Sequence, residues 1–235
     1  MTSGSRPPGS RLVDLVQVMD TLRINCPWDA RQTQQSLMPH LLEETYEAID
    51  ALAADDQAAV CEELGDVLLQ VVFQARVAQE RTDGTGYSID DVADGIIAKL
   101  TRRHPHVFGD VSVSGPDEVK QNWDAIKAAE RAAAGDGRPV SALDGVPMTQ
   151  PALSLAAQLL RRAGRAGVPA ELADLDEIPE LSELGRQLFA LVARAQSAGL
   201  DPELELRAAA RAYSAQVRRW EATTDGPGTS SVDIR

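Results

Sequence analysis

The chain has 235 residues, of which 43% are hydrophobic, 4% are aromatic and 25% are charged. Its net charge of -13 argues against nucleic acid as the principal partner, because neutralising phosphates requires clustered Lys and Arg. No apolar run could cross a bilayer and the first ten residues lack the apolar core of a signal peptide, so we expect a cytoplasmic protein without a membrane partner. Few aromatic residues with abundant Ala and Leu favour an all-α fold.

The first predicted element is a helix over residues 11–24. The preceding residues 1–10 are rich in Gly, Ser and Pro and are predicted to be disordered. Apolar residues at helical spacing are expected to face the core: Leu12, Leu15, Val16, Met19 and Leu22. The stretch Cys26-Pro27-Trp28-Asp29 ends this helix, and Asp29 is expected to cap a short helix that follows.

Two amphipathic helices follow, over about residues 40–53 and 57–80. Pro39 is expected to precede the first helix, and Asp55-Asp56 forms the turn between the two. The apolar stripe of the first helix contains Leu41, Leu42, Tyr46, Ile49 and Leu52. The stripe of the second contains Leu64, Val67, Leu68, Val71, Val72 and Ala75.

Five carboxylates flank these stripes in the patterns E-E-x-x-E and E-x-x-D: Glu43, Glu44, Glu47, Glu63 and Asp66. Residues three or four apart share one side of a helix, so a short hairpin would bring both sets together. Carboxylates that face one another repel unless a cation lies among them, and the alternative is that they point into water. Residues 41–74 contain no Lys or Arg, whereas a solvated helical face more often alternates Glu with Lys. The pattern therefore favours a metal site.

A basic region follows a break at residues 84–86. Ser88 and Asp91 form a capping box that opens a helix, and His104-Pro105 ends it. The last turns of this helix carry Lys99, Arg102 and Arg103. A further helix over about residues 116–132 carries Trp123 and Lys127 on one face.

The sequence after residue 132 predicts a linker and a second helical module. Residues 133–150 are rich in Gly, Asp, Pro and Ser, residues 151–222 are expected to form the module, and residues 223–235 a disordered tail. The segment Glu183-Leu184-Gly185-Arg186 repeats the segment from Glu63 to Asp66 about 120 residues later, which suggests a duplicated domain. Because Arg186 replaces the second acid, we expect this copy to be inactive and to support packing or oligomerisation.

These motifs resemble those of the MazG nucleoside triphosphate pyrophosphohydrolases, in the all-alpha NTP pyrophosphatase superfamily. The resemblance rests on Cys26-Pro27-Trp28-Asp29 with Gln32-Thr33, the stretch from Leu42 to Glu47, Glu63-Leu64-Gly65-Asp66, the stretch from Lys99 to Phe108, and Trp123 with Ile126-Lys127. The two acidic motifs, E-E-x-x-E and E-x-x-D, are shared with dUTPase-like and phosphoribosyl-ATP pyrophosphohydrolase relatives. The R-R-H-P-H-V-F stretch makes the match specific. The resemblance implies a MazG-like helical bundle over residues 11–132, followed by a degenerate second repeat.

The resemblance also implies roles for individual residues. Metal ligands would be Glu44, Glu47, Glu63 and Asp66, and their oxygens suit Mg2+, with Mn2+ as a substitute. Glu43 would bind a further ion or orient the attacking water. Substrate-binding residues would be Trp28 and Trp123 near the base, Gln32 in the first motif, and Lys99, Arg102, Arg103 and Lys127 on the phosphates.

The implied reaction cleaves a ribo- or deoxynucleoside triphosphate to the monophosphate and pyrophosphate, in the N-terminal half of the chain. The implied role is clearance of non-canonical or damaged nucleotides, by a homodimer or a higher homo-oligomer.

Other interpretations stay open at this point. The chain could be a non-catalytic helical interaction protein, or a related phosphoribosyl-ATP or dUTP/dCTP pyrophosphatase. A di-iron oxidase would require Glu-x-x-His motifs, which the sequence lacks. Trp28 and Trp123 could simply cap the core, and the cations at the end of the basic helix could face its negative dipole end. Cys26 and Cys61 are expected to be buried, reduced thiols.

Overall fold

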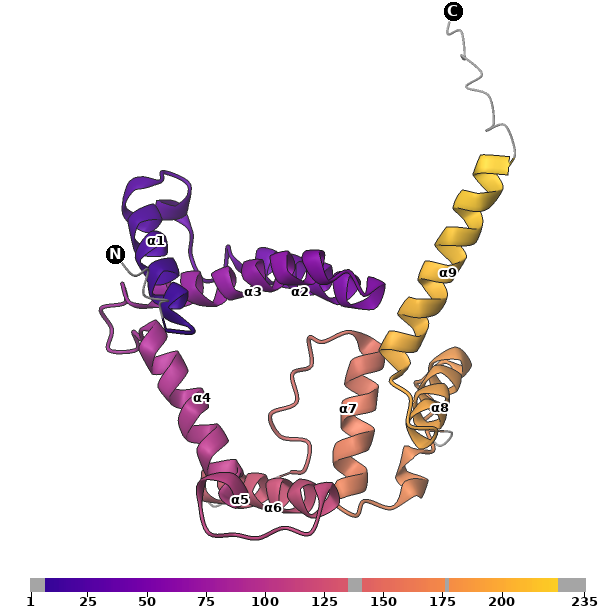
Figure 1. Cartoon of the computed structure of the whole chain (residues 1–235). Coiled ribbons are helices and arrows are strands. Elements are labelled where there is room, and N and C mark those ends of the chain that lie inside the picture. The colour runs from indigo at the N-terminus through magenta and orange to yellow at the C-terminus, as the bar shows by residue number, and fades with distance from the viewer. Residues whose placement is uncertain (1–6, 135–140, 176–177, 224–235) are drawn as a thin grey trace, which may run out of the picture. The chain divides into compact units, whose positions relative to one another are not determined.

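A computed structural model describes residues 7–134, 141–175 and 178–223. Every regular element in these ranges is a helix, which confirms the all-α prediction. The α-helices are α1 (Ser10–Asn25), α2 (Met38–Ala54), α3 (Gln57–Ala78), α4 (Ile89–Arg103), α5 (Pro105–Phe108), α6 (Pro116–Ala134), α7 (Ala152–Arg165), α8 (Glu183–Ser197) and α9 (Pro202–Thr223), and the 3-10 turns are η1 (Asp29–Arg31) and η2 (Ala170–Ala173) (Figure 1). None of these helices is long and apolar enough to span a membrane.

The chain divides into two compact units, Met1–Ala129 and Glu130–Arg235. In unit 1, α1 and α2 both pack on α3. In unit 2, α7 packs on α8 and on α9, with Ala157 and Val192 buried. The assignment of catalysis to residues 11–132 and of a supporting role to residues 151–222 stays a prediction. The expectations for residues 1–6, for 135–140 within the linker and for 224–235 lie outside the described residues.

Local side-chain hydrogen bonds set several helix ends where the sequence predicts them. The capping box of Ser88 and Asp91 is formed at the start of α4. The Asp29 prediction is wrong, because Asp29 is the first residue of η1 and Trp28 precedes it without a side-chain cap. Pro39 lies in the first turn of α2 and not before it, where its missing N–H costs no intrahelical bond.

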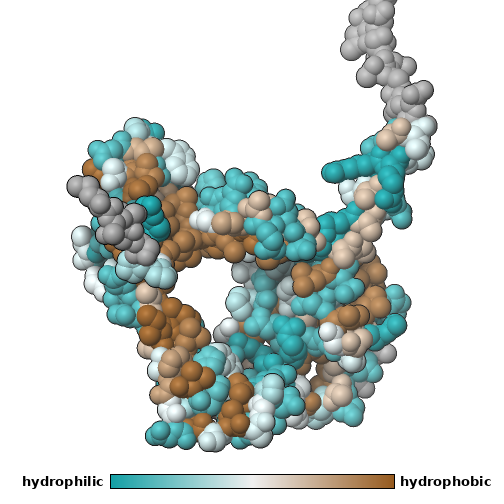
Figure 2. Space-filling model, viewed as in Figure 1, coloured by the Kyte–Doolittle hydropathy of each residue, from teal (hydrophilic) through white to brown (hydrophobic). Residues whose placement is uncertain are grey.

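The core of unit 1 is smaller than the apolar stripes predict. It consists of Met19, Leu37, Val72 and Phe73, with partly buried side chains packed around them. Several residues assigned to the stripes are exposed instead: Leu12, Leu22, Leu42, Leu52, Leu64 and Val71. The reason is geometric, because each stripe is wider than the surface that one neighbouring helix covers. α4 likewise exposes apolar residues, which Figure 2 shows as a brown surface: Val92, Ile96, Ile97 and Leu100.

The two cysteines are unpaired, as expected. The prediction that both thiols are buried is wrong, because Cys61 is exposed and Cys26 is only half-buried. Cys61 lies in the first turns of α3 and is exposed.

Candidate functional site

The α2–α3 hairpin brings acidic side chains from both motifs together. Asp55 ends α2 in a left-handed conformation with a φ of 55°, and Asp56 caps α3 by accepting hydrogen bonds from the backbone N–H groups of Ala58 and Ala59. These two residues turn the chain within one short connection, so α2 and α3 run side by side (Figure 1). Ala48 and Ala51 are buried, and their small side chains let the helices approach closely.

Three carboxylates meet in this interface. One oxygen each of Glu44, Glu63 and Asp66 lies within 4.8 Å of the others, and all three residues are partly buried. Oxygens around one Mg2+ lie roughly 3–4 Å apart, because each metal–oxygen distance is about 2.1 Å. A small movement of these side chains would therefore fit them to a single ion. In the described part of the chain, this is the one grouping of three possible metal ligands.

The electrostatics of the cluster favour a bound cation. Burial raises the pKa of Glu44, and the neighbouring carboxylates of Asp66, Glu47 and Glu43 raise it further. Burial, followed by the charges of Glu47 and Asp66, raises the pKa of Glu63. Glu47 lies outside the group of three but close enough to act on both residues. The repulsion that raises these pKa values is the repulsion that a divalent cation would relieve.

Glu43 is the residue before Glu44 on α2, and its charge acts on the cluster. Its carboxylate is exposed and lies 3.8 Å from Nδ1 of His40, one turn earlier in α2. The His40 ring in turn meets the Trp28 ring edge-on, with 5.8 Å between their centroids. His40 thus connects Trp28 to the acidic helix. Sequence reasoning missed it, although its spacing of three from Glu43 was the available signal.

The Trp28 ring contacts two other rings and remains largely exposed to solvent. It lies 6.4 Å from the Phe73 ring, centroid to centroid, while 52% of the residue stays exposed. Gln32 shapes this loop, because its Nε2 donates to the Trp28 carbonyl at 3.0 Å and its Oε1 accepts from the Ser36 hydroxyl at 2.7 Å. The exposed ring can stack on a base, and a substrate contact by Gln32 stays a prediction.

The basic residues gather in another part of unit 1. The Arg103 guanidinium lies over the Trp123 ring, 5.3 Å from its centroid, and the His104 ring meets Trp123 edge-on at 4.8 Å. Lys99 and Arg102 are exposed near the end of α4, and Lys127 lies one turn beyond Trp123 on α6. α4 leads away from the α2–α3 hairpin, so this basic cluster and the acidic cluster lie on different helices (Figure 1).

A buried polar residue that the sequence analysis missed follows the acids on α3. Gln70 is 6% exposed, and its Oε1 has no hydrogen-bond partner among the described residues. It lies four residues after Asp66 and three before Phe73, between the acidic cluster and the residues that contact Trp28. An amide interrupting the apolar run of residues 67–73 was the available signal.

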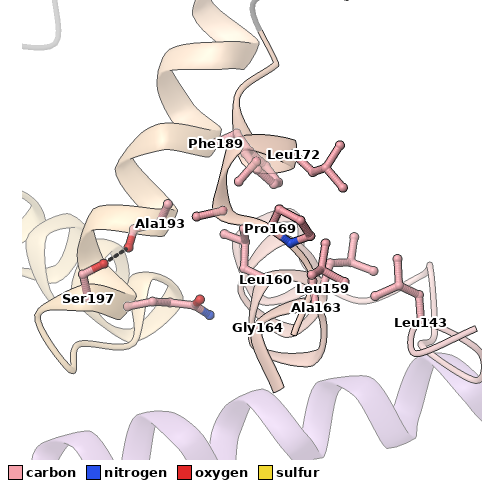
Figure 3. Close-up of a pocket in the computed structure, with 14 residues that line it drawn as sticks. Leu143, Leu159, Leu160, Ala163, Gly164, Pro169, Leu172, Phe189, Ala193 and Ser197 are labelled. Atoms are coloured by element: carbon pink, nitrogen blue, oxygen red, sulfur yellow. Dashed lines mark hydrogen bonds between the residues drawn. The ribbon is translucent and has the colours of Figure 1, made fainter. Parts of the chain in front are cut away.

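A cavity of unit 2 does not have the chemistry of this site. It measures about 690 Å³ and is lined mainly by residues of α7, η2 and α8 (Figure 3). Among the described residues its lining is apolar apart from Gln196 and Ser197. This part of the lining provides neither a cation for phosphates nor a carboxylate for a metal.

The second copy of the acidic motif has a different electrostatic arrangement. Arg186 pairs with Glu183 at 3.0 Å and donates to the carbonyl of Leu181 at 2.8 Å. The Glu183 carboxylate is thereby neutralised within its own helix, and its pKa is lowered by the hydrogen bond from Arg186. The inactivity of this second copy stays a prediction.

Comparison with known proteins identifies the family. Residues 32–108 match the MazG nucleotide pyrophosphohydrolase domain. An uncharacterized 26.1 kDa protein of Streptomyces cacaoi is 44% identical, over 91% of this chain and 84% of its own length. The nucleoside triphosphate pyrophosphohydrolase of Mycolicibacterium smegmatis is 43% identical over 92% of this chain, which spans 60% of that protein. The nucleoside triphosphate pyrophosphohydrolase/pyrophosphatase MazG of Thermotoga maritima is 36% identical, over 92% of this chain and 87% of its own. The chain therefore belongs to the MazG family of nucleotide pyrophosphohydrolases.

Proposed function

We propose that this MazG-family hydrolase is a Mg2+-dependent enzyme that cleaves nucleoside and deoxynucleoside triphosphates to monophosphate and pyrophosphate. The observation that carries the proposal is the meeting of Glu44, Glu63 and Asp66 at the α2–α3 interface. Its support comes from the family and from an all-oxygen ligand set that suits Mg2+ or Mn2+.

The carboxylates of the hairpin would hold the ion, with Glu47 as a fourth ligand. A bound divalent ion polarises phosphoryl oxygens and lowers the pKa of its water. Glu43 is exposed beside the cluster and is the residue we assign to orienting the attacking water or to binding a further ion. The helices hold the three carboxylates near one another before the ion binds, so only a small side-chain movement would be needed.

The substrate would lie with its base against Trp28 and its phosphates at the carboxylate-bound ion. Lys99, Arg102, Arg103 and Lys127 would neutralise the phosphate chain. These cations lie on α4 and α6 and not on the acidic hairpin, and we infer that a second copy of the chain would bring them to it, as a homodimer or a higher homo-oligomer. The exposed apolar side chains of α4 support this assembly, since they are the kind of surface that a subunit interface covers.

The role that follows is removal of non-canonical or damaged nucleotides from the cytoplasmic pool, without nucleic acid or membrane partners. A screen of ordinary, oxidised and deaminated triphosphates tests it, with the phosphate products resolved. We expect pyrophosphate release that requires Mg2+ and disappears in Glu63→Gln. Glu62→Gln is the matched control, because Glu62 is the exposed neighbour outside the group of three, and it should keep activity. Orthophosphate release, or no hydrolysis of any triphosphate by the wild type, would contradict the proposal.

A further inference from the structure

We propose that Arg23 is a positioning residue whose buried guanidinium holds the loop of residues 26–37, and with it Trp28, beside the acidic hairpin. The effect on catalysis rests on the proposed function, in which Trp28 contacts the base. The contacts that support the inference do not depend on that function.

The Arg23 side chain is only 9% exposed and uses all three of its nitrogens. Nε and Nη2 form a fork on the Glu80 carboxylate, at 2.9 Å and 2.6 Å. Nη1 donates to the backbone carbonyls of Asp29 and Gln32, the latter at 3.0 Å. One rigid group therefore joins the end of α1, the residues after α3 and both sides of the turn η1.

The Arg23–Glu80 ion pair makes the attachment of the loop strong. The hydrogen bond from Arg23 lowers the pKa of Glu80, and the same bond raises the pKa of Arg23, so both groups stay charged. A planar guanidinium fixes the direction of each donor, whereas the ammonium of a lysine is a point charge without a fork. Buried beneath the loop, the Arg23 cation needs these acceptors, so the loop carbonyls are held where the guanidinium places them.

The constraint reaches Trp28 through short covalent and hydrogen-bonded steps. Asp29 directly follows Trp28, so fixing its carbonyl restricts the backbone beside the ring. The Gln32 side chain then donates back to the Trp28 carbonyl and closes the turn. With 52% of the residue exposed, burial alone does not orient the ring. The backbone attachment orients it together with the ring contacts to His40 and Phe73.

The other half of the loop has its own attachments. Nε2 of Gln74, on α3, donates to the Gln34 carbonyl at 3.2 Å, and Leu37 is fully buried in the core. Loss of Arg23 should therefore release residues 26–32 while the loop stays connected to the fold. This separates a positioning role from a general contribution to stability.

Arg76 provides the matched control. It pairs with Asp20 at 2.7 Å and with Glu80 at 3.0 Å, which joins α1 to α3. Within the described residues, its side-chain contacts are with Asp20 and Glu80 and not with the loop. Arg76→Met should weaken the same helix contact as Arg23→Met but leave Trp28 in place.

The first measurement is acrylamide quenching of Trp28 fluorescence in the full chain with Trp123→Phe and Trp220→Phe, which leave Trp28 as the single tryptophan. We expect Arg23→Met to increase quenching and lower the anisotropy, Arg23→Lys to fall between it and the parent, and Arg76→Met to match the parent. Unchanged quenching in Arg23→Met, or an equal increase in Arg76→Met, would overturn the inference.

The second measurement is steady-state kinetics with the two native tryptophans restored. We expect Arg23→Met to raise KM for a nucleoside triphosphate about tenfold with little change in kcat, because a misplaced contact weakens binding. A purely structural role would lower kcat through loss of folded enzyme and leave KM unchanged. If the wild type hydrolyses no triphosphate, the proposed function fails, while the quenching comparison still decides the role of Arg23.

Discussion

The Glu80→Gln substitution removes the negative charge of a carboxylate that accepts hydrogen bonds from Arg23 and Arg76, and the glutamine side chain has nearly the same shape. Three charge-assisted hydrogen bonds are weakened, and the Arg23 cation, 9% exposed, loses its counter-charge. Removing one partner of a buried pair costs about 3–5 kcal/mol. Because 44% of the Glu80 side chain is exposed, water screens part of the loss, and we expect about 2–3 kcal/mol. For a chain of this size that lowers Tm by roughly 4–12 °C.

The pH dependence has a definite sign. The pKa of Glu80 is lowered in the folded protein, chiefly by the hydrogen bond from Arg23. Its stabilising contribution is therefore present above the unfolded pKa of about 4.3, and is lost as pH falls through the folded pKa. The difference in Tm between the wild type and Glu80→Gln should be large at pH 7 and shrink below about pH 4.

Thermal unfolding followed by circular dichroism measures both effects. Arg11→Gln is the control, because its ion pair with Asp14 involves an Arg side chain that is 81% exposed, and it should leave Tm nearly unchanged. A double-mutant cycle with Arg23→Met isolates the coupling between the two residues. Equal Tm values for the wild type and Glu80→Gln at pH 7, or a cycle without coupling, would show that the Arg23–Glu80 pair does not stabilise the fold.

Three further predictions concern the site and its support. Without metal, Glu63→Gln should be more stable than the wild type at pH 7, and the difference should vanish as pH falls. The reason is that a carboxyl group with a raised pKa destabilises the fold only where it is ionised. Melting curves from pH 4 to 8 test this, and a variant less stable than the wild type would contradict it. Gln70→Leu should raise the free energy of unfolding by about 1 kcal/mol in denaturant titrations, since a buried oxygen without a partner is removed; a loss would mean that Gln70 is satisfied in solution. Phe73→Ala should cost about 3–5 kcal/mol in the same titration, because Phe73 is 2% exposed in the core, and a cost near zero would place it outside that core.

Local signals explain what the sequence predicts correctly. The helix bounds follow from short-range chemistry, such as the capping box of Ser88 and Asp91. The meeting of Glu44, Glu63 and Asp66 follows from helical spacing and one short turn, both readable from the residues themselves.

The features that escape prediction depend on residues far apart in the chain. Arg23 and Glu80 are 57 positions apart, and nothing in the local pattern of either indicates that they meet. Apolar spacing marks Leu12 and Leu64 as core residues, but how much of each stripe is covered depends on the neighbouring helices, so both are exposed. The position of the basic cluster also escapes prediction. Helical spacing shows where Arg103 lies on its helix, but it does not show where that helix lies relative to the acidic residues.

Binding of a divalent cation between α2 and α3 can be tested by anomalous diffraction from crystals of the full chain soaked in Mn2+. We expect an anomalous peak within coordination distance of Glu44, Glu63 and Asp66. A map without a peak there, with the three carboxylates turned toward solvent, would contradict it.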